Sequence, residues 1–127
     1  MIRNYRDLEV WQRAIDIACY RLSDQFPKTE IYGLTSQLRR AAVSVAANIA
    51  EGHGRRRTKE YLHHLDIAYG SLTEVETHLT IAARLEYLKA DAITETMSLA
   101  AQIGRMLNGL IASLERRECP DPSAPES

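Results

Sequence analysis

The sequence predicts an all-α protein, an antiparallel up-down-up-down four-helix bundle formed by one domain. Apolar residues recur every three or four positions in four separate segments, and the connections between these segments are short. The apolar residues are mainly Ala, Leu and Ile, which favour helices. A chain of 127 residues can bury one core without disulfides or metals. We therefore expect a bundle over residues 1–116 and, because the proline-rich end lacks periodicity, a disordered tail over residues 117–127.

The first two helices are expected to be joined by a connection that contains Phe26-Pro27. Proline cannot continue the helical hydrogen-bond ladder, so the first helix, which Asp7 can cap, ends before this pair. The second helix is predicted from about Leu34 to Glu51. The expected core face of the first helix comprises Leu8, Trp11, Ile15, Ala18 and Leu22. In the second it comprises Leu34, Leu38, Ala41, Val45 and Ile49, beside a polar row of Gln37, Arg40, Ser44, Asn48 and Glu51.

Gly52-His53-Gly54 is predicted to end the second helix, because glycine readily adopts the left-handed conformation found at helix ends. Thr58 is the expected N-cap of a third helix over about Lys59 to Glu86. Its core face comprises Leu65, Ala68, Leu72, Val75, Leu79 and Ala82, and Gly70 on its flank is expected to mark a close approach of another helix. Asp91 can cap a fourth helix, whose face comprises Leu99, Ile103, Met106, Leu110 and Leu114.

Candidate reaction chemistry is sparse. Glu60-x-x-His63, followed by His64 and Asp66, corresponds to one half of a carboxylate-bridged di-iron site, but the fourth helix offers only Glu95 toward the other half. A solvated helix face is the simpler interpretation. Likewise, Glu74 and His78 are expected to form an intrahelical pair. We expect no enzyme activity, no catalytic residue, no metal and no cofactor.

Composition points to a cytoplasmic protein without disulfides. No apolar run approaches the roughly 20 residues that span a bilayer, and the first residues lack the apolar core of a signal peptide. Cys19 and Cys119 are widely separated, so we expect a buried Cys19, an exposed Cys119 and neither a disulfide nor a zinc site. We expect no membrane partner.

Positive charge is concentrated although the net charge is only −1. Six basic residues crowd around the second helix and the loop after it, and they are the candidate nucleic-acid-binding residues: Arg39, Arg40, Arg55, Arg56, Arg57 and Lys59. Small residues on the second helix permit close packing from more than one side. The candidate oligomer interface there comprises Leu38, Ala42, Ala46, Ala47 and Asn48.

Three segments carry a family resemblance: RDLEVWQRA, FPKTEIYGLTSQLRRAAVSVAANIAEGHGRR and IAYGSLTEVETHL. The combination of LTSQLRRA, NIAEG and AYGSLTE resembles the bacterial four-helix-bundle proteins encoded by intervening sequences within 23S ribosomal RNA genes. That family is similar to the accessory variability determinant of diversity-generating retroelements, a barrel-shaped homopentamer that associates with a reverse transcriptase and nucleic acid. The resemblance implies a homopentamer here. Val45 stands where many members have proline, so the second helix should lack a kink.

Two functions are consistent with these observations. In the first, a homo-oligomer binds RNA or DNA backbone through its six basic residues, with a protein partner such as a reverse transcriptase. In the second, the oligomer is a structural or protein-binding scaffold without a nucleic-acid ligand, in which Arg39 or Arg40 pairs with Glu51 or with an acidic residue of a neighbouring subunit.

Overall fold

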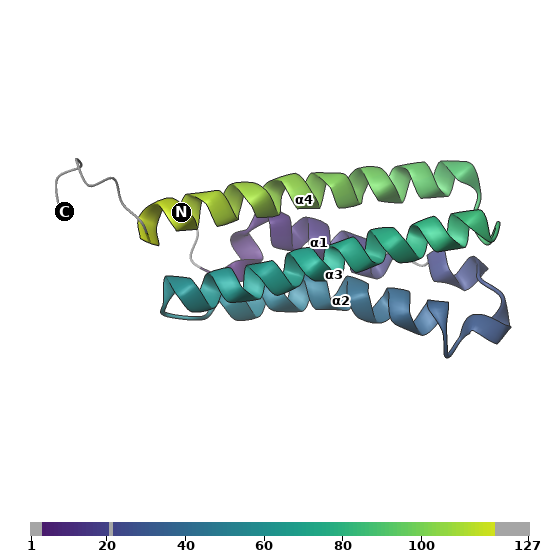
Figure 1. Cartoon of the computed structure of the whole chain (residues 1–127), viewed down its shortest axis with the longest axis horizontal. Coiled ribbons are helices and arrows are strands. Elements are labelled where there is room, and N and C mark those ends of the chain that lie inside the picture. The colour runs from purple at the N-terminus through teal and green to yellow at the C-terminus, as the bar shows by residue number, and fades with distance from the viewer. Residues whose placement is uncertain (1–3, 21, 119–127) are drawn as a thin grey trace.

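The structure, a computed structural model, describes residues 4–20 and 22–118. Four helices lie along one long axis (Figure 1): α1 (Glu9–Cys19), α2 (Leu34–His53), α3 (Thr58–Arg84) and α4 (Ala90–Glu118). Short 3-10 helices precede α1 (η1, Tyr5–Asp7) and join it to α2 (η2, Leu22–Gln25, and η3, Lys28–Glu30). The described residues form no strand, which confirms the all-α prediction.

The core is formed where α2 packs against α3, α3 against α4, and α1 against both α2 and α4. Every residue of the predicted core faces of α2 and α3 is buried, so these two faces are confirmed. The α2 helix is continuous through Val45, where the sequence lacks the proline. The centre of the core comprises Ile49, Leu65, Leu79, Ile103, Leu107, Val45 and Val75, each less than 2% exposed.

The first helix differs from its prediction in length and in rotation. Asp7 belongs to η1, where its carboxylate accepts the Asn4 N–H at 3.3 Å, and α1 begins two residues later without a side-chain cap. It ends at Cys19, which is exposed and not buried as expected. Because α1 contacts both α2 and α4, its buried face is Val10, Ala14 and Ile17, and the predicted residues Trp11, Ile15 and Ala18 are half-buried beside it.

The buried face of α4 is shifted in the same way. Ile103 and Leu114 are buried as predicted, but Ala100 and Leu107 complete the face. Leu99, Met106 and Leu110 pack half-buried at its edges. The helix also continues through Glu118, two residues past the expected end of the bundle, and the rest of the predicted tail lies outside the described residues.

The segment Gly52-His53-Gly54 ends α2 as predicted, with His53 as the last residue and Gly54 as the C-cap. The expected left-handed conformation is absent, because neither Gly52 nor Gly54 has a positive φ, and Gly52 lies inside the helix. A Cβ on Gly52 would lie 2.7 Å from His64 Cβ and 3.0 Å from the Tyr61 ring, so glycine is needed because α3 passes close by. Gly70, where a close approach was expected, would place its Cβ more than 4 Å from any neighbouring side chain.

The turns also differ in detail. Thr58 is the first residue of α3 and not its cap, since Arg57 occupies the N-cap position without a side-chain hydrogen bond. After α3, Glu86 adopts the left-handed conformation with φ of 60°. The Tyr87 N–H then bonds to the Ala82 carbonyl at 2.9 Å, which is the Schellman ending of a helix. Asp91 lies in the first turn of α4.

Candidate nucleic-acid interface

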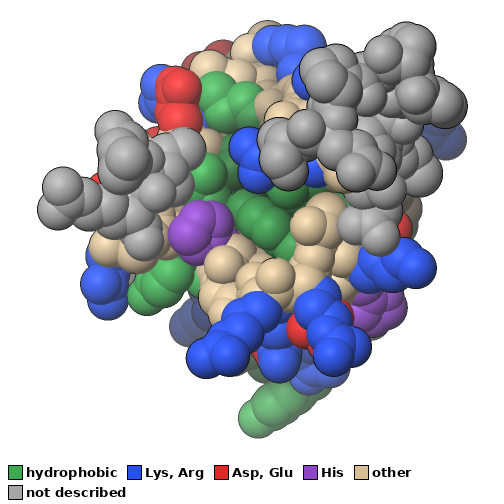
Figure 2. Space-filling model, turned by 90° about the vertical axis from the view of Figure 1, so that its left-hand side faces the viewer, with side chains coloured by type: hydrophobic (Ala, Val, Ile, Leu, Met, Phe, Trp, Pro, Cys, Tyr) green, Lys and Arg blue, Asp and Glu red, His purple; other side chains and the backbone are tan. Residues whose placement is uncertain are grey.

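The basic loop lies at one end of the bundle, where residues 54–57 join α2 to α3 (Figure 1). Viewed onto this end, Lys and Arg side chains gather on the surface (Figure 2). Arg55, Arg56, Arg57 and Lys59 are all exposed. Arg55 donates to Glu51 at 2.7 Å, so its charge is partly offset. No carboxylate of the described residues forms an ion pair with the other three, which leaves their charges available to an anion.

The Arg39 side chain forms contacts within the chain. Its Nη2 lies 2.7 Å from the Asp24 carboxylate, and its Nε donates to the Ser23 hydroxyl at 2.8 Å. Arg39 therefore fastens η2 onto α2. From Arg39 to the end of α2 at His53 the helix rises about 21 Å at 1.5 Å per residue, and Arg55 follows that end. Arg39 and its exposed neighbour Arg40 are thus separated from the loop, and the six predicted residues do not form one patch.

Two further arginines lie at the loop end. Arg116 and Arg117 occupy the last turn of α4, which ends on the same side of the molecule as the basic loop (Figure 1). Both are exposed. This arrangement could not be predicted from the sequence, because basic residues are common in the last turn of any helix. We call these residues the basic end: Arg55, Arg56, Arg57, Lys59, Arg116 and Arg117.

The start of α3 strengthens the positive potential of the basic end. The first N–H groups of a helix lack partners within it, and the helix dipole places positive charge there. The N-cap residue Arg57 forms no side-chain capping bond, because a guanidinium has donors but no acceptor for the free N–H groups of α3. The acidic residues Glu51, Glu60 and Glu115 are interspersed nearby in the chain, so the positive potential is local.

The polar row of α2 faces α3 over part of its length. The hydroxyls of Ser44 and Ser71 share a hydrogen bond of 2.7 Å. Asn48 donates to the carbonyl and hydroxyl of Ser44, at 2.9 and 3.0 Å, and its Oδ1 accepts from His64 Nδ1 at 3.2 Å. These side chains join two helices of one chain. Gln37, Arg40 and Glu51 remain exposed.

The expected interface residues divide into buried and accessible ones. Leu38, Ala42 and Ala46 are at most 7% exposed, since the chain's own core covers them. Ala47 is exposed and Asn48 is half-buried. Ala47 belongs to an open apolar hollow of about 350 Å³ between α1 and α2. We call it the α1–α2 groove, lined by Tyr5, Trp11, Ile15, Ala18, Val43, Ala46, Ala47 and Ala50.

Two of the side-chain pairings that the sequence suggested, Arg39 with Glu51 and Glu74 with His78, are not formed. Arg39 pairs with Asp24 and Glu51 with Arg55, so Arg39 and Glu51 do not pair with each other. No hydrogen bond or ion pair of the described residues joins Glu74 to His78, and His78 Nδ1 is buried without a partner.

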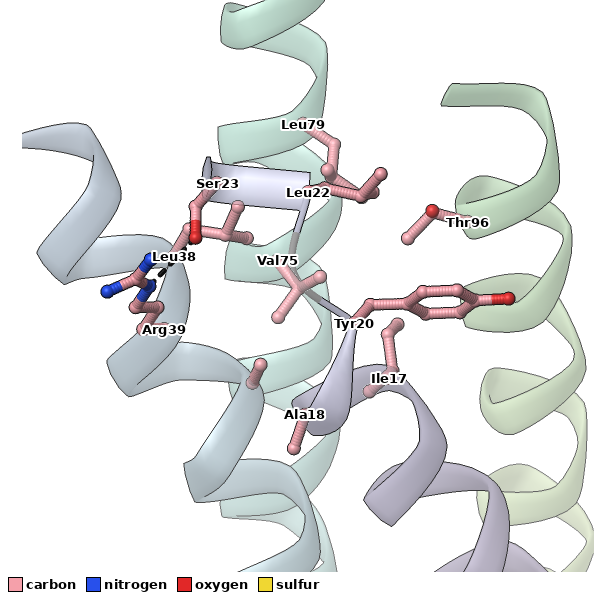
Figure 3. A pocket seen from close by; sticks show the side chains of 11 residues that line it. Ile17, Ala18, Tyr20, Leu22, Ser23, Leu38, Arg39, Val75, Leu79 and Thr96 are labelled. Atoms are coloured by element: carbon pink, nitrogen blue, oxygen red, sulfur yellow. Dashed lines mark hydrogen bonds between the residues drawn. The ribbon is translucent and has the colours of Figure 1, made fainter. Parts of the chain in front are cut away.

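A small, partly open pocket lies where α1 ends (Figure 3). It is bounded by side chains such as Ile17, Leu38, Val75 and Thr96, and the Arg39–Ser23 bond closes one side. Its volume of about 30 Å³ suffices for a water molecule but not for a metabolite. In the described part of the chain, no group of three or more His, Cys, Asp or Glu side chains lies close enough together to hold a metal ion. Glu60 and His63 therefore belong to no such group.

Three tyrosines have perturbed acidities that follow from their contacts. Tyr20 donates to Glu95 at 3.1 Å and Tyr87 donates to Glu30 at 3.0 Å, and each bond raises the pKa of the phenol. Burial alone raises the pKa of Tyr61, whose hydroxyl has no hydrogen-bond partner among the described residues. The first two bonds tie the α1–α2 connection to the rest of the bundle. No helix among the described residues has the length and apolar character needed to cross a membrane.

Known proteins share this fold and sequence pattern. A crystal structure from Bacteroides thetaiotaomicron VPI-5482, described as a protein of unknown function from the S23 ribosomal protein family, has a TM-score of 0.71 and 21% identity. The match covers 80% of this chain and 97% of that one, which supports the fold. No curated protein matches the sequence. The model of the 23S rRNA-intervening sequence protein family matches residues 6–109, from the start of η1 to the last third of α4. The chain therefore belongs to the 23S rRNA-intervening sequence protein family.

Proposed function

We propose that this protein is a non-enzymatic, cytoplasmic homo-oligomer that binds the phosphate backbone of RNA or DNA through its basic end. One observation carries the proposal: Arg56, Arg57 and Lys59 are exposed and form no ion pair with any described residue, and the last turn of α4 brings Arg116 and Arg117 to the same end. Backbone charge dominates nucleic-acid affinity, so an overall charge of −1 is compatible with binding at one end of an elongated molecule.

We further propose that each chain is an antiparallel up-down-up-down bundle and that five copies assemble as a homopentamer. The family resemblance supports this assembly. A cyclic oligomer repeats its surface with the symmetry of the ring, so five basic ends would present a multivalent phosphate-binding surface. Because affinities of linked sites combine, a weak patch on one copy would be sufficient for strong binding by the assembly.

Binding to a structured ribosomal RNA fragment and to duplex DNA, measured between about 50 and 200 mM salt, tests the proposal. Log affinity should fall linearly with log salt concentration. The variant Arg56→Glu/Arg57→Glu/Lys59→Glu should lower affinity at 50 mM salt by at least about 100-fold and flatten the salt slope. The matched control Lys28→Glu/Lys89→Glu/Arg105→Glu has the same net charge but alters exposed residues away from the basic end. Equal losses in both variants would reject a localised site.

The second candidate function is a structural or protein-binding scaffold, with a reverse transcriptase among the partners that the resemblance suggests. The α1–α2 groove favours it, because Val43 in this groove is 57% exposed and apolar. Under this alternative the triple reversal at the basic end would leave function unchanged, whereas Ala47→Arg would disrupt assembly. Undetectable nucleic-acid binding at the lowest salt concentration would favour the scaffold.

A further inference from the structure

The outer side of α3 carries an uncharged surface in addition to the α1–α2 groove. Thr73, Thr77 and Thr80 each donate their hydroxyl to the carbonyl four residues earlier, at 3.1, 2.9 and 2.8 Å. All three are exposed, and Ile81 beside them is 42% exposed. Because the helix itself satisfies the hydroxyl donors, covering this surface leaves no unpaired donor and carries little desolvation penalty.

Gly70 extends this surface by one turn. A glycine inside a helix costs up to about 1 kcal/mol relative to alanine. A Cβ on Gly70 would meet no atom of the described residues within 4 Å, so the missing side chain leaves the backbone of this turn open to a neighbouring molecule. We call this surface the threonine face, formed by Gly70, Thr73, Thr77, Thr80 and Ile81.

The threonine face and the α1–α2 groove lie on different sides of the molecule. The helices α1 and α3 both pack against α2 and α4, so they occupy diagonal corners of the bundle. The outer side of α3 therefore faces away from α1. One surface is a helix with small side chains, bordered by Glu76 and Arg84, and the other is a hollow between two helices lined entirely by apolar or aromatic residues.

We propose that the threonine face of one copy packs into the α1–α2 groove of the next copy. The pairing matches a narrow helix face to a groove, and neither set of residues contains a charge. Glu76 and Arg84 border the threonine face, and their long side chains can keep their charges in solvent. The 12 residues from Gly70 to Ile81 span about 16 Å of α3. The threonine face is therefore long enough to cover the groove, whose residues on α1 and α2 each span about 11 Å. This inference rests on the proposed homo-oligomer and specifies its contact.

A contact between two different surfaces has a geometric consequence. Each copy offers one threonine face and one groove, so every added copy leaves one of each free until the assembly closes. A closed ring satisfies all of them. In a ring whose axis follows the helices, all basic ends lie on the same rim, and none is covered by the contact because neither surface contains a residue of the basic end.

Two single substitutions block the surfaces separately. Thr77→Arg places a charge on the threonine face, and Ala47→Arg places one in the groove. Both positions are exposed within the chain, so the fold should be retained, as circular dichroism would check. Ala101→Arg makes the same change at an exposed alanine of α4 outside both surfaces and serves as the control. Light scattering after gel filtration should show wild type and control as oligomers and the two blocked variants as monomers.

Mixing the two blocked variants gives the decisive measurement. The Thr77→Arg chain keeps an intact groove and the Ala47→Arg chain keeps an intact threonine face, so an equimolar mixture should form dimers and nothing larger. Monomers in the mixture, or oligomers in either variant alone, would overturn the proposed contact while the oligomer of the wild type stands. A monomeric wild type would overturn both the contact and the proposed assembly.

Discussion

Replacing Gly52 with alanine tests the closest approach of α2 and α3. The new Cβ would lie 2.7 Å from His64 Cβ, whereas ordinary contacts begin at 3.4 Å. A Cβ atom is fixed to its backbone, so the two helices would have to separate locally by about 0.7 Å. Such overpacking costs about 2 kcal/mol. The same shift would weaken the 3.2 Å bond between His64 and Asn48, which is worth about 1 kcal/mol.

Alanine also has a higher helix propensity than glycine, and this difference stabilises the variant by about 1 kcal/mol. The steric effect is larger, and we expect a net loss of about 2 kcal/mol in the free energy of unfolding. Tm should fall by about 6 to 12 °C for a chain of this size. Gly109→Ala is the matched control, since this exposed glycine of α4 has no neighbour within 4 Å and the propensity gain stands alone. That variant should be stabilised by up to about 1 kcal/mol.

Urea unfolding followed by circular dichroism at one fixed protein concentration measures both variants. The fixed concentration matters because the stability of an oligomer depends on it. If Gly52→Ala were stabilised as much as Gly109→Ala, the close approach of the two helices would not exist in solution. The explanation of Gly52 by packing would then be wrong.

Three further substitutions test other contacts. Arg39→Ala should lower stability by about 1 kcal/mol, because its ion pair with Asp24 is half-exposed, and amide exchange should quicken in η2. Glu86→Gly should raise Tm by a few degrees, worth about 1 kcal/mol, because glycine tolerates the φ of 60°. Tyr61→Phe should leave stability at pH 7 unchanged or slightly higher, as the hydroxyl has no partner. Since the pKa of Tyr61 is raised above 10.0 in the folded state, its contribution is present below pH 10 and is lost above it, and denaturant titrations across pH 9 to 12 should show a smaller loss for the variant.

The core faces of α2 and α3 could be predicted because each has one clear apolar stripe. In α1 and α4 the apolar residues occur as adjacent pairs, such as Leu99-Ala100 and Met106-Leu107. Their apolar arc is therefore wide, and periodicity alone does not locate its centre. Contact with two neighbouring helices determines it: Ala100 and Leu107 are completely buried, and Leu99 and Met106 lie at the edge.

The glycines show a different limit of sequence interpretation. Glycine serves wherever a left-handed conformation or a close contact is needed, and a single sequence does not distinguish these needs. Gly52 meets the second need, whereas the left-handed conformation at the end of α3 is taken by Glu86. Predicted caps were similarly displaced by one or two residues, because Asp7 bonds within η1 and leaves the N-cap of α1 to Leu8.

The candidate site shows how closeness in sequence differs from closeness in space. Arg39 lies in the first half of α2 and Arg55 just beyond its end, so the helix separates them by about 21 Å. Arg55 and Arg116 are far apart in the chain but lie at the same end of the bundle, because α2 and α4 both end there. Helices that lie side by side bring together the charges of all the termini at one end. The local positive charge that a phosphate backbone would meet is therefore larger than the net charge of the sequence indicates. The basic end therefore depends on helix lengths as much as on composition, and shortening α4 by one turn would remove Arg116 and Arg117 from it without touching the loop.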